Sequence, residues 1–268
     1  MPRTPVGRGI AGQLVFLGTG TSVGVPVIGC GCAVCRGGDP RNRRTRCGLA
    51  LGLPEGTLLV DTPTDLRTQL LREDIGLAHA LLYTHEHADH LFGLDDVRLF
   101  PYALGGPLPL YCEPAVERRI RRSFDYCFPD ADCPPPVSTV PRLTFHTIGE
   151  EPFDVLGRRV VPIRLRHGSL GVLGFRFGGV AYCTDTNGIP EESWPLLAGL
   201  DVLVLDALRP APHPTHFSLD EAIEVARRVG AERTLFTHMT HDLDHAATNA
   251  ALPPGMELAY DGLQIAIT

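Results

Sequence analysis

The sequence contains no run of about 18 unbroken apolar residues, the length that a membrane-spanning helix requires. It also shows no repeat, no low-complexity tract and no obvious linker. The opening stretch MPRTPVGRGIAG lacks the apolar core of a signal peptide. From these absences we expect no membrane partner and a single domain over residues 1–268, with about residues 1–11 as a flexible lead-in. We also expect a cytoplasmic location with reduced thiols.

An excess of positive charge is missing as well. The formal net charge is −7 and the isoelectric point is near 5.9. A surface that follows nucleic acid carries clustered basic residues, so this balance argues against a nucleic-acid partner. Apolar residues make up 44% and charged residues 21%, which is a globular composition. An anionic substrate would have to be held by metal ions and a few local arginines.

Short strand-like runs alternate with helical patterns along the chain. In HFSLDEAIEVARRVG, Ser218 and Glu221 form a predicted capping box, and Gly230 stands where the helix should end. A second helix is predicted over Thr64–Arg72, and Pro129–Pro141 reads as a loop that either covers a site or connects strands. This mixture predicts an α/β protein with layered sheets and helices on the outer faces. The predicted strands are QLVFLG, GLALGL, TLLVDT, ALLYTH, LPLYC, RRVVPIRL, GFRFG, VAYCTD, DVLVLD, RTLFTH and LQIAI.

Metal-compatible side chains follow five of these predicted strands. They are Asp61, His85, Asp185, Asp206 and His238. Acidic residues often begin turns after strands, which would account for one or two of them but not for all five. Loops at one edge of a sheet are where rigid scaffolds present functional groups. We therefore expect a site at that edge.

The densest cluster is YTHEHADH, which places His85, His87, Asp89 and His90 within six positions. Neutral imidazole and carboxylate are ligands for zinc, manganese or iron, and a loop that leaves a strand can direct them to adjacent metal ions. The H-x-H-x-D-H spacing resembles the metallo-β-lactamase superfamily. Three further residues match that superfamily in order, namely His167, Asp185 and His238.

The resemblance implies two divalent ions, zinc or manganese, in a four-layer αββα sandwich. One ion would be held by His85, His87 and His167, and the other by Asp89, His90 and His238, with Asp185 shared between them. Asp61 matches an early aspartate of the superfamily that supports the ligand loop. Attack by a metal-bridging hydroxide is the implied chemistry.

The N-terminal motif GCGCAVC adds Cys30, Cys32 and Cys35. Three thiolates need a fourth ligand for tetrahedral zinc, and His241 in THMTHD is the candidate. LGTGTSVGVPVIGCGCAVC and the C-terminal NAALPPGMELAYDGLQIAI resemble the phosphoribosyl cyclic phosphate phosphodiesterase (PhnP-like) branch, which implies a structural zinc. The remaining cysteines are expected to be small apolar residues: Cys47, Cys112, Cys127, Cys133 and Cys183.

His216, in PHPTHFSLDEA, resembles the histidine that faces the scissile phosphate in phosphodiesterase branches. The resemblance implies catalytic roles for His216 and Asp89, and a small phosphorylated substrate such as 5-phosphoribosyl 1,2-cyclic phosphate. In the segment Arg41–Arg46, Arg43 and Arg46 are candidates to hold a substrate phosphate, although a solvated basic loop fits equally well.

Several alternatives remain open at this point. A ribonuclease Z-like or nucleotide phosphodiesterase shares His216, but the chain has no basic insertion of the kind that grips tRNA. An ester, lactone or thioester hydrolase of the same superfamily would use the same metals without His216. The pyrroloquinoline-quinone biosynthesis protein B has a similar cysteine-rich opening, but the complete metal set argues against a purely binding role. The oligomeric state is open as well, with a homodimer as one candidate because related enzymes are often dimers.

Overall fold

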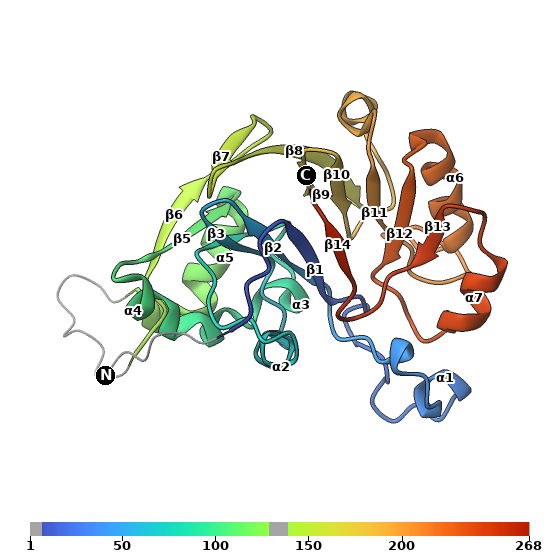
Figure 1. Cartoon of the computed structure of the whole chain (residues 1–268), viewed down its shortest axis with the longest axis horizontal. Coiled ribbons are helices and arrows are strands. Elements are labelled where there is room, and N and C mark those ends of the chain that lie inside the picture. Colours follow the sequence, from blue (N-terminus) through green and yellow to red (C-terminus); the bar gives the residue numbers. More distant parts are fainter. Residues whose placement is uncertain (1–6, 129–138, 268) are drawn as a thin grey trace.

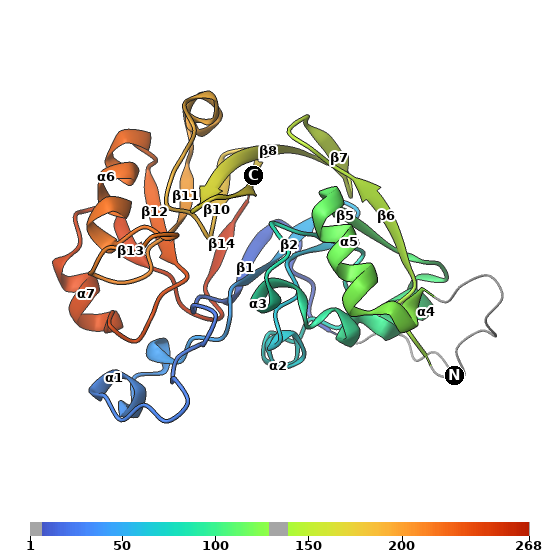
Figure 2. The same cartoon turned by 180° about the vertical axis from the view of Figure 1, so that it is seen from behind.

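The computed structural model describes residues 7–128 and 139–267. Two seven-stranded mixed sheets lie face to face, with helices on their outer sides (Figures 1 and 2). The first sheet runs in the order β14 (Gln264–Ala266), β1 (Gln13–Gly18), β2 (Gly48–Leu53), β3 (Gly56–Val60), β4 (Ala80–Leu82), β5 (Leu108–Cys112), β6 (Leu143–Thr147). The second runs in the order β13 (Met256–Leu258), β12 (Arg233–Thr237), β11 (Val202–Asp206), β10 (Val180–Cys183), β9 (Leu170–Phe177), β8 (Arg158–His167), β7 (Phe153–Val155). The predicted αββα arrangement is confirmed.

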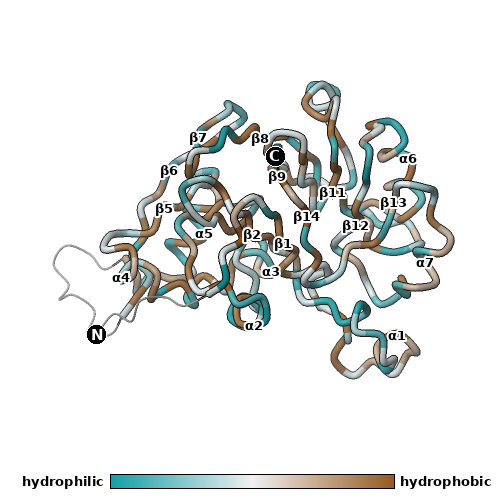
Figure 3. Tube along the Cα trace, viewed as in Figure 1, coloured by the Kyte–Doolittle hydropathy of each residue, from teal (hydrophilic) through white to brown (hydrophobic). Residues whose placement is uncertain are grey.

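Alternation along the strands builds the central core. In β1, Leu14 and Phe16 point between the sheets, whereas Val15 and Leu17 point toward the helices. The second sheet contributes Phe175 to the central cluster in the same way. β1 and β2 are buried along almost their whole length because both faces of the first sheet are covered there, and the largely brown β1 in Figure 3 agrees with this.

Helices pack on the outer faces and complete the four layers. The first sheet is covered by α2 (Leu66–Arg72), α3 (Ala88–Leu91), α4 (Phe100–Leu104) and α5 (Pro114–Ser123). The second is covered by α6 (Leu219–Val229) and α7 (His245–Ala251), whereas α1 (Ala33–Arg36) lies on a separate arm (Figure 1). Short 3₁₀ helices occupy Pro40–Asn42, Leu94–Leu99, Asp125–Cys127 and Glu191–Leu197. Within the described ranges, no helix combines the length and apolar character needed to cross a membrane.

Each sheet has a parallel half whose strand ends define the site. β3, β4 and β5 are parallel neighbours, and so are β10, β11 and β12. Carboxyl ends of parallel strands meet at one edge of a sheet, which places the residues that follow them side by side.

Local sequence signals agree with most of these elements. The capping box of Ser218 and Glu221 is present, and Gly230 ends α6 in the left-handed conformation. The second predicted helix begins at Leu66, two residues later than expected. Of the expected lead-in, Arg8 pairs with Glu73 and Ile10 is buried, so packing begins before residue 11. Most of the Pro129–Pro141 loop lies outside the described residues.

Candidate metal centre

The residues that follow the parallel strands adopt an unusual backbone conformation. Asp61, Asp185 and His238 have φ values of 65°, 52° and 60°. Non-glycine residues rarely adopt this left-handed conformation, and those that do cluster at functional sites. The sharp turn after each strand directs the side chain back toward the sheet edge.

Two groups of four potential ligand atoms form there, and a third group of three comprises Asp206, His216 and His238. His85, His87, His167 and Asp185 place one atom each within 4.8 Å of one another, and so do Asp89, His90, Asp185 and His238. Asp185 belongs to both groups: its Oδ2 lies 3.8 Å from His85 Nε2, and its Oδ1 lies 3.1 Å from His90 Nε2. These are the two sets that the family resemblance implied, with the shared carboxylate between them.

Hydrogen bonds behind the imidazoles fix their orientation. His90 Nδ1 lies 2.7 Å from Asp61 Oδ2, and Asp61 also accepts hydrogen bonds from the amide and hydroxyl of Thr84. His167 Nδ1 donates to the carbonyl of Thr215 at 2.7 Å. Each contact leaves Nε2 facing the site, which is how second-sphere partners orient metal-binding histidines. Asp61 therefore occupies the supporting position expected for it.

The electrostatics of the site favour cations. In the described part of the chain, the buried Nε2 atoms of His85, His90 and His238 have no hydrogen-bond partner. Burial holds the pKa of His85 well below its usual value, and the electrostatic effect of His90 lowers it further. The imidazole of His85 is therefore neutral. Burial opposes the protonation of His238, but Asp185 and Asp89 raise its pKa to about 9. The carboxylates thus draw positive charge into the site, and divalent ions would supply it.

Asp206 has a partner at the site that the sequence does not indicate. Asp206, at the end of β11, accepts a hydrogen bond from His216 Nδ1 at 2.6 Å and another from the amide of Thr186. His216 is buried, and its ring lies 4.6 Å from the ring of His238 and 4.6 Å from that of His167. The position of Asp206 after an apolar strand was the available signal, but nothing in the sequence connects it to His216.

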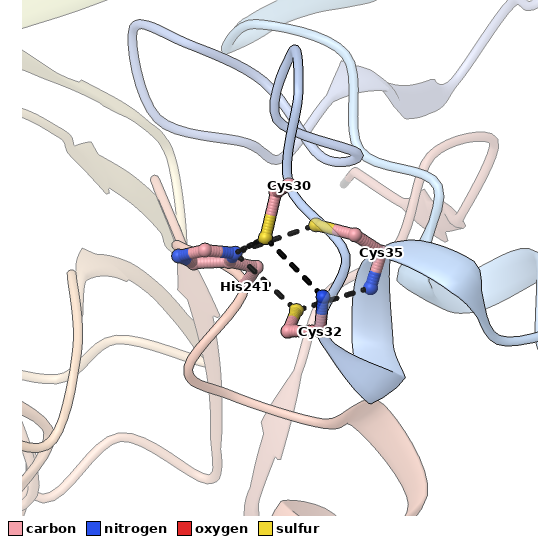
Figure 4. Close-up of side chains that lie close together, drawn as sticks. All are labelled: Cys30, Cys32, Cys35 and His241. Carbon is pink, nitrogen blue, oxygen red and sulfur yellow. Dashed lines mark hydrogen bonds between the residues drawn. The ribbon is translucent and has the colours of Figure 1, made fainter.

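A second cluster joins the α1 arm to the loop after β12. His241 Nδ1 lies 3.2, 3.5 and 3.3 Å from the sulfurs of Cys30, Cys32 and Cys35 (Figure 4). Ligands of tetrahedral zinc, at ~2.3 Å for sulfur and ~2.1 Å for nitrogen, lie ~3.5 Å apart. The four side chains therefore fit a structural zinc ion. Cys47, Cys112 and Cys183 are buried, and Cys127 is partly buried; Cys133 lies outside the described residues.

The basic segment after the cysteines makes contacts within the protein. Arg46 forms an ion pair with Asp65 at 3.0 Å, and exposed Arg43 donates to the carbonyl of Gly37. Arg44 is fully buried and donates to the carbonyls of Thr240 and Leu243. A substrate role for Arg43 and Arg46 stays a prediction, whereas Arg44 serves the structure of the loop that carries His241.

A two-sheet sandwich with paired histidine and carboxylate groups at its strand ends defines a class of metal-binding folds to which this chain conforms. The chain belongs to the beta-lactamase superfamily, whose domain model matches residues 57–239. Divalent ions bound in such a site lower the pKa of water and neutralise charge on a phosphoryl or carbonyl oxygen.

The structural comparisons place this chain near one branch. The crystal structure of a new diphosphatase from the PhnP family is 43% identical, covers 94% of this chain and 96% of that chain, and has a TM-score of 0.88. The resemblance to the PhnP-like branch is thereby confirmed. Zn²⁺-bound PqqB from Methylobacterium extorquens is 21% identical over 95% of this chain and 100% of that chain, with a TM-score of 0.75, and shares the fold.

A longer curated relative also matches. An octanoyltransferase from Porphyromonas gingivalis is 35% identical over 259 residues, which is 95% of this chain and 51% of that protein. This chain therefore spans about half the length of that relative.

Proposed function

We propose that this chain is a dinuclear metal-dependent phosphodiesterase that hydrolyses a small phosphorylated substrate. The observation that carries the proposal is the His216–Asp206 pair, buried against His167 and His238 at the sheet edge. Hydrolysis of lactones and esters does not require such an acid, whereas the leaving alkoxide of a phosphodiester benefits from protonation. The 43% identity to a PhnP-family diphosphatase supports hydrolysis at a phosphoryl group.

The proposed ligands are the seven residues of the two groups. Zinc or manganese would be held by His85, His87, His167, Asp89, His90 and His238, with Asp185 shared, and a structural zinc by Cys30, Cys32, Cys35 and His241.

His216 would supply the proton for the leaving oxygen. Asp206 accepts the Nδ1 hydrogen, which leaves Nε2 to exchange a proton with substrate and stabilises the charged imidazolium. Asp89 would contribute to catalysis as one of the ligands of the second ion. Its Oδ2 lies 3.8 Å from His238 Nε2. The preferred substrate class is a cyclic sugar phosphate, with 5-phosphoribosyl 1,2-cyclic phosphate first, and a diphosphate second.

The test is steady-state hydrolysis by manganese- or zinc-loaded protein. We expect kcat/KM above about 10⁴ M⁻¹ s⁻¹ on 5-phosphoribosyl 1,2-cyclic phosphate. His216→Ala should lose ~10²–10⁴-fold on that substrate, which has a poor leaving group. It should lose far less on bis(p-nitrophenyl) phosphate, whose leaving group needs no proton. Equal losses on both substrates would contradict the acid role. No turnover of any phosphodiester by the wild type would overturn the proposed function.

A further inference from the structure

Two basic side chains outside the proposed ligand set lie beside this site. Both are on the loop from Ala207 to Ser218 that joins β11 to α6. Besides His216, that loop carries Arg209 and His213, which have no role in the chemistry above. The chain contains no lysine, so arginine and histidine are its only cationic side chains. Any protein contact to a second anionic group of the substrate would therefore come from these two residue types or from polar groups.

His213 presents a hydrogen-bond donor near the reaction site. Its ring lies 5.2 Å from that of His216 and is half-buried. Its Nδ1 is 3.4 Å from the amide of Thr215, and an amide N–H can only donate. Nδ1 therefore accepts, and the ring hydrogen is on Nε2. Partial burial lowers the pKa of His213, and the electrostatic effects of His216 and Arg209 lower it further. Both effects favour the neutral ring.

Arg209 lies along the same loop. Its Nε and Nη2 donate to the carbonyls of Ala211 at 3.3 Å and Pro212 at 3.2 Å, so the side chain runs toward His213. Within residues 7–128 and 139–267, its Nη1 has no hydrogen-bond partner and no carboxylate forms an ion pair with it. One edge of the guanidinium is therefore available to a ligand.

The loop that holds both residues is fixed to the site. The carbonyl of Thr215 accepts from His167, and Asn187 donates to the carbonyl of Pro214 at 2.8 Å. The amide of Leu208 donates to Phe217 at the other end of the loop. Because these contacts set the distance from His213 to the ligand groups, an anion held there would have a defined position relative to the cleaved bond.

We propose that His213 and Arg209 form a second phosphate subsite, which selects substrates that carry another phosphoryl group beside the one that is cleaved. The inference rests on the proposed phosphodiesterase function and narrows its substrate class. The second phosphoryl group belongs either to a sugar phosphate or to a diphosphate. Both offer oxygens to Nε2 of His213 and to the guanidinium of Arg209.

Three substrates test the subsite with metal-loaded protein. They are 5-phosphoribosyl 1,2-cyclic phosphate, ADP-ribose as a diphosphate, and bis(p-nitrophenyl) phosphate, which has no second phosphoryl group. The readout is the ratio of kcat/KM on each of the first two to kcat/KM on the third. His213→Ala and Arg209→Gln should each lower that ratio at least about tenfold, mainly through KM, because each loses a hydrogen bond to a charged group.

Two further variants sharpen the result. His213→Gln keeps a donor at a similar reach and should retain part of the ratio that His213→Ala loses. Arg227→Gln removes the same charge at the exposed far end of α6, and should keep the wild-type ratio. The substrate whose ratio falls more identifies the source of the second phosphoryl group. Unchanged ratios in both His213→Ala and Arg209→Gln overturn the subsite. A wild type that hydrolyses only bis(p-nitrophenyl) phosphate also overturns it, whereas one that hydrolyses none of the three overturns the proposed function itself.

Discussion

At the scale of single residues, Asp61 is the clearest case of a side chain that acts through another. It contacts His90 Nδ1 at 2.7 Å and is fully buried. Asp61→Asn should weaken binding of the second divalent ion by ~10–100-fold, because its amide cannot orient His90 in the same way. Competition with a chelator, read as metal content per chain, measures the change. Asp154→Asn, at an exposed ion pair with Arg159, is the matched control and should bind metal like the wild type.

His79 gives a pH-dependent prediction that does not involve the metal ligands. Its Nδ1 accepts from the amide of Thr57 at 3.0 Å, and burial lowers its pKa below the ordinary value of 6.5. The unfolded chain therefore takes up a proton at a higher pH than the folded chain does. The contribution of His79 to stability is present above pH 6.5 and is lost as the pH falls through the folded pKa.

Urea unfolding at pH 7.5 and 5.0 checks this prediction for His79. The His79→Gln variant should lose less free energy of unfolding on acidification than the wild type does. Stability that depends on metal falls equally in the two proteins, so the difference between them isolates His79. An identical loss in both would show that His79 titrates alike in the folded and unfolded chains.

At the scale of elements, hydrogen bonds from Arg44 connect the segment after α1 to the loop after β12. Its guanidinium donates to Thr240 at 2.7 Å and to Leu243 at 2.6 Å, on either side of His241. Arg44→Met would leave two carbonyls without their donor, and we expect a loss of about 3 kcal/mol in the free energy of unfolding. Urea titration of the zinc-loaded protein measures it. Arg43→Met, at an exposed position, should change stability by less than ~0.5 kcal/mol.

Elements with strong local signals were predicted, and weaker ones were not. β1, β2 and β5 have the predicted bounds, since each is a continuous apolar run between turn residues. β6 and β7 are short, with mostly exposed or half-buried residues, and α5 buries only Val116 and Ile120 among many charged residues. β6 depends on pairing with β5, about 35 positions earlier, and α5 on packing against the first sheet, neither of which a local pattern contains, whereas β7 is too short and too polar to stand out even though it pairs with the adjacent β8.

The site residues also differ in how far local sequence predicts them. The HxHxDH motif could be read because its residues share one turn and one helix. The grouping of His167, Asp185 and His238 with it came from family resemblance, since three separate strands bring them together. The Asp206 contact to His216 depends on the path of the loop from Ala207 to Ser218, and the sequence contains no periodicity that specifies such a path.

At the scale of the whole molecule, both metal-compatible clusters join parts of the chain that are far apart in sequence. The divalent site combines the loop after β4 with the last residue of β8 and with residues that follow β10 and β12, so each sheet supplies part of it. The cysteine cluster joins the α1 arm to His241, more than 200 positions away. In addition, β14 returns from the C-terminal half to pair with β1. Bound metal would therefore connect the two halves.

Metal removal should consequently lower the stability of the whole fold rather than of one loop. Ions that bind only the folded chain stabilise it by RT ln(1 + [metal]/Kd), or about 4 kcal/mol at a thousandfold excess over Kd. Dialysis against a chelator should shift the thermal transition downward, and added zinc should restore it. His241→Ala removes the cysteine-cluster contribution alone, so its transition should fall further when a chelator strips the divalent site. An unchanged transition after complete metal removal would show that the protein scaffold alone holds both clusters together.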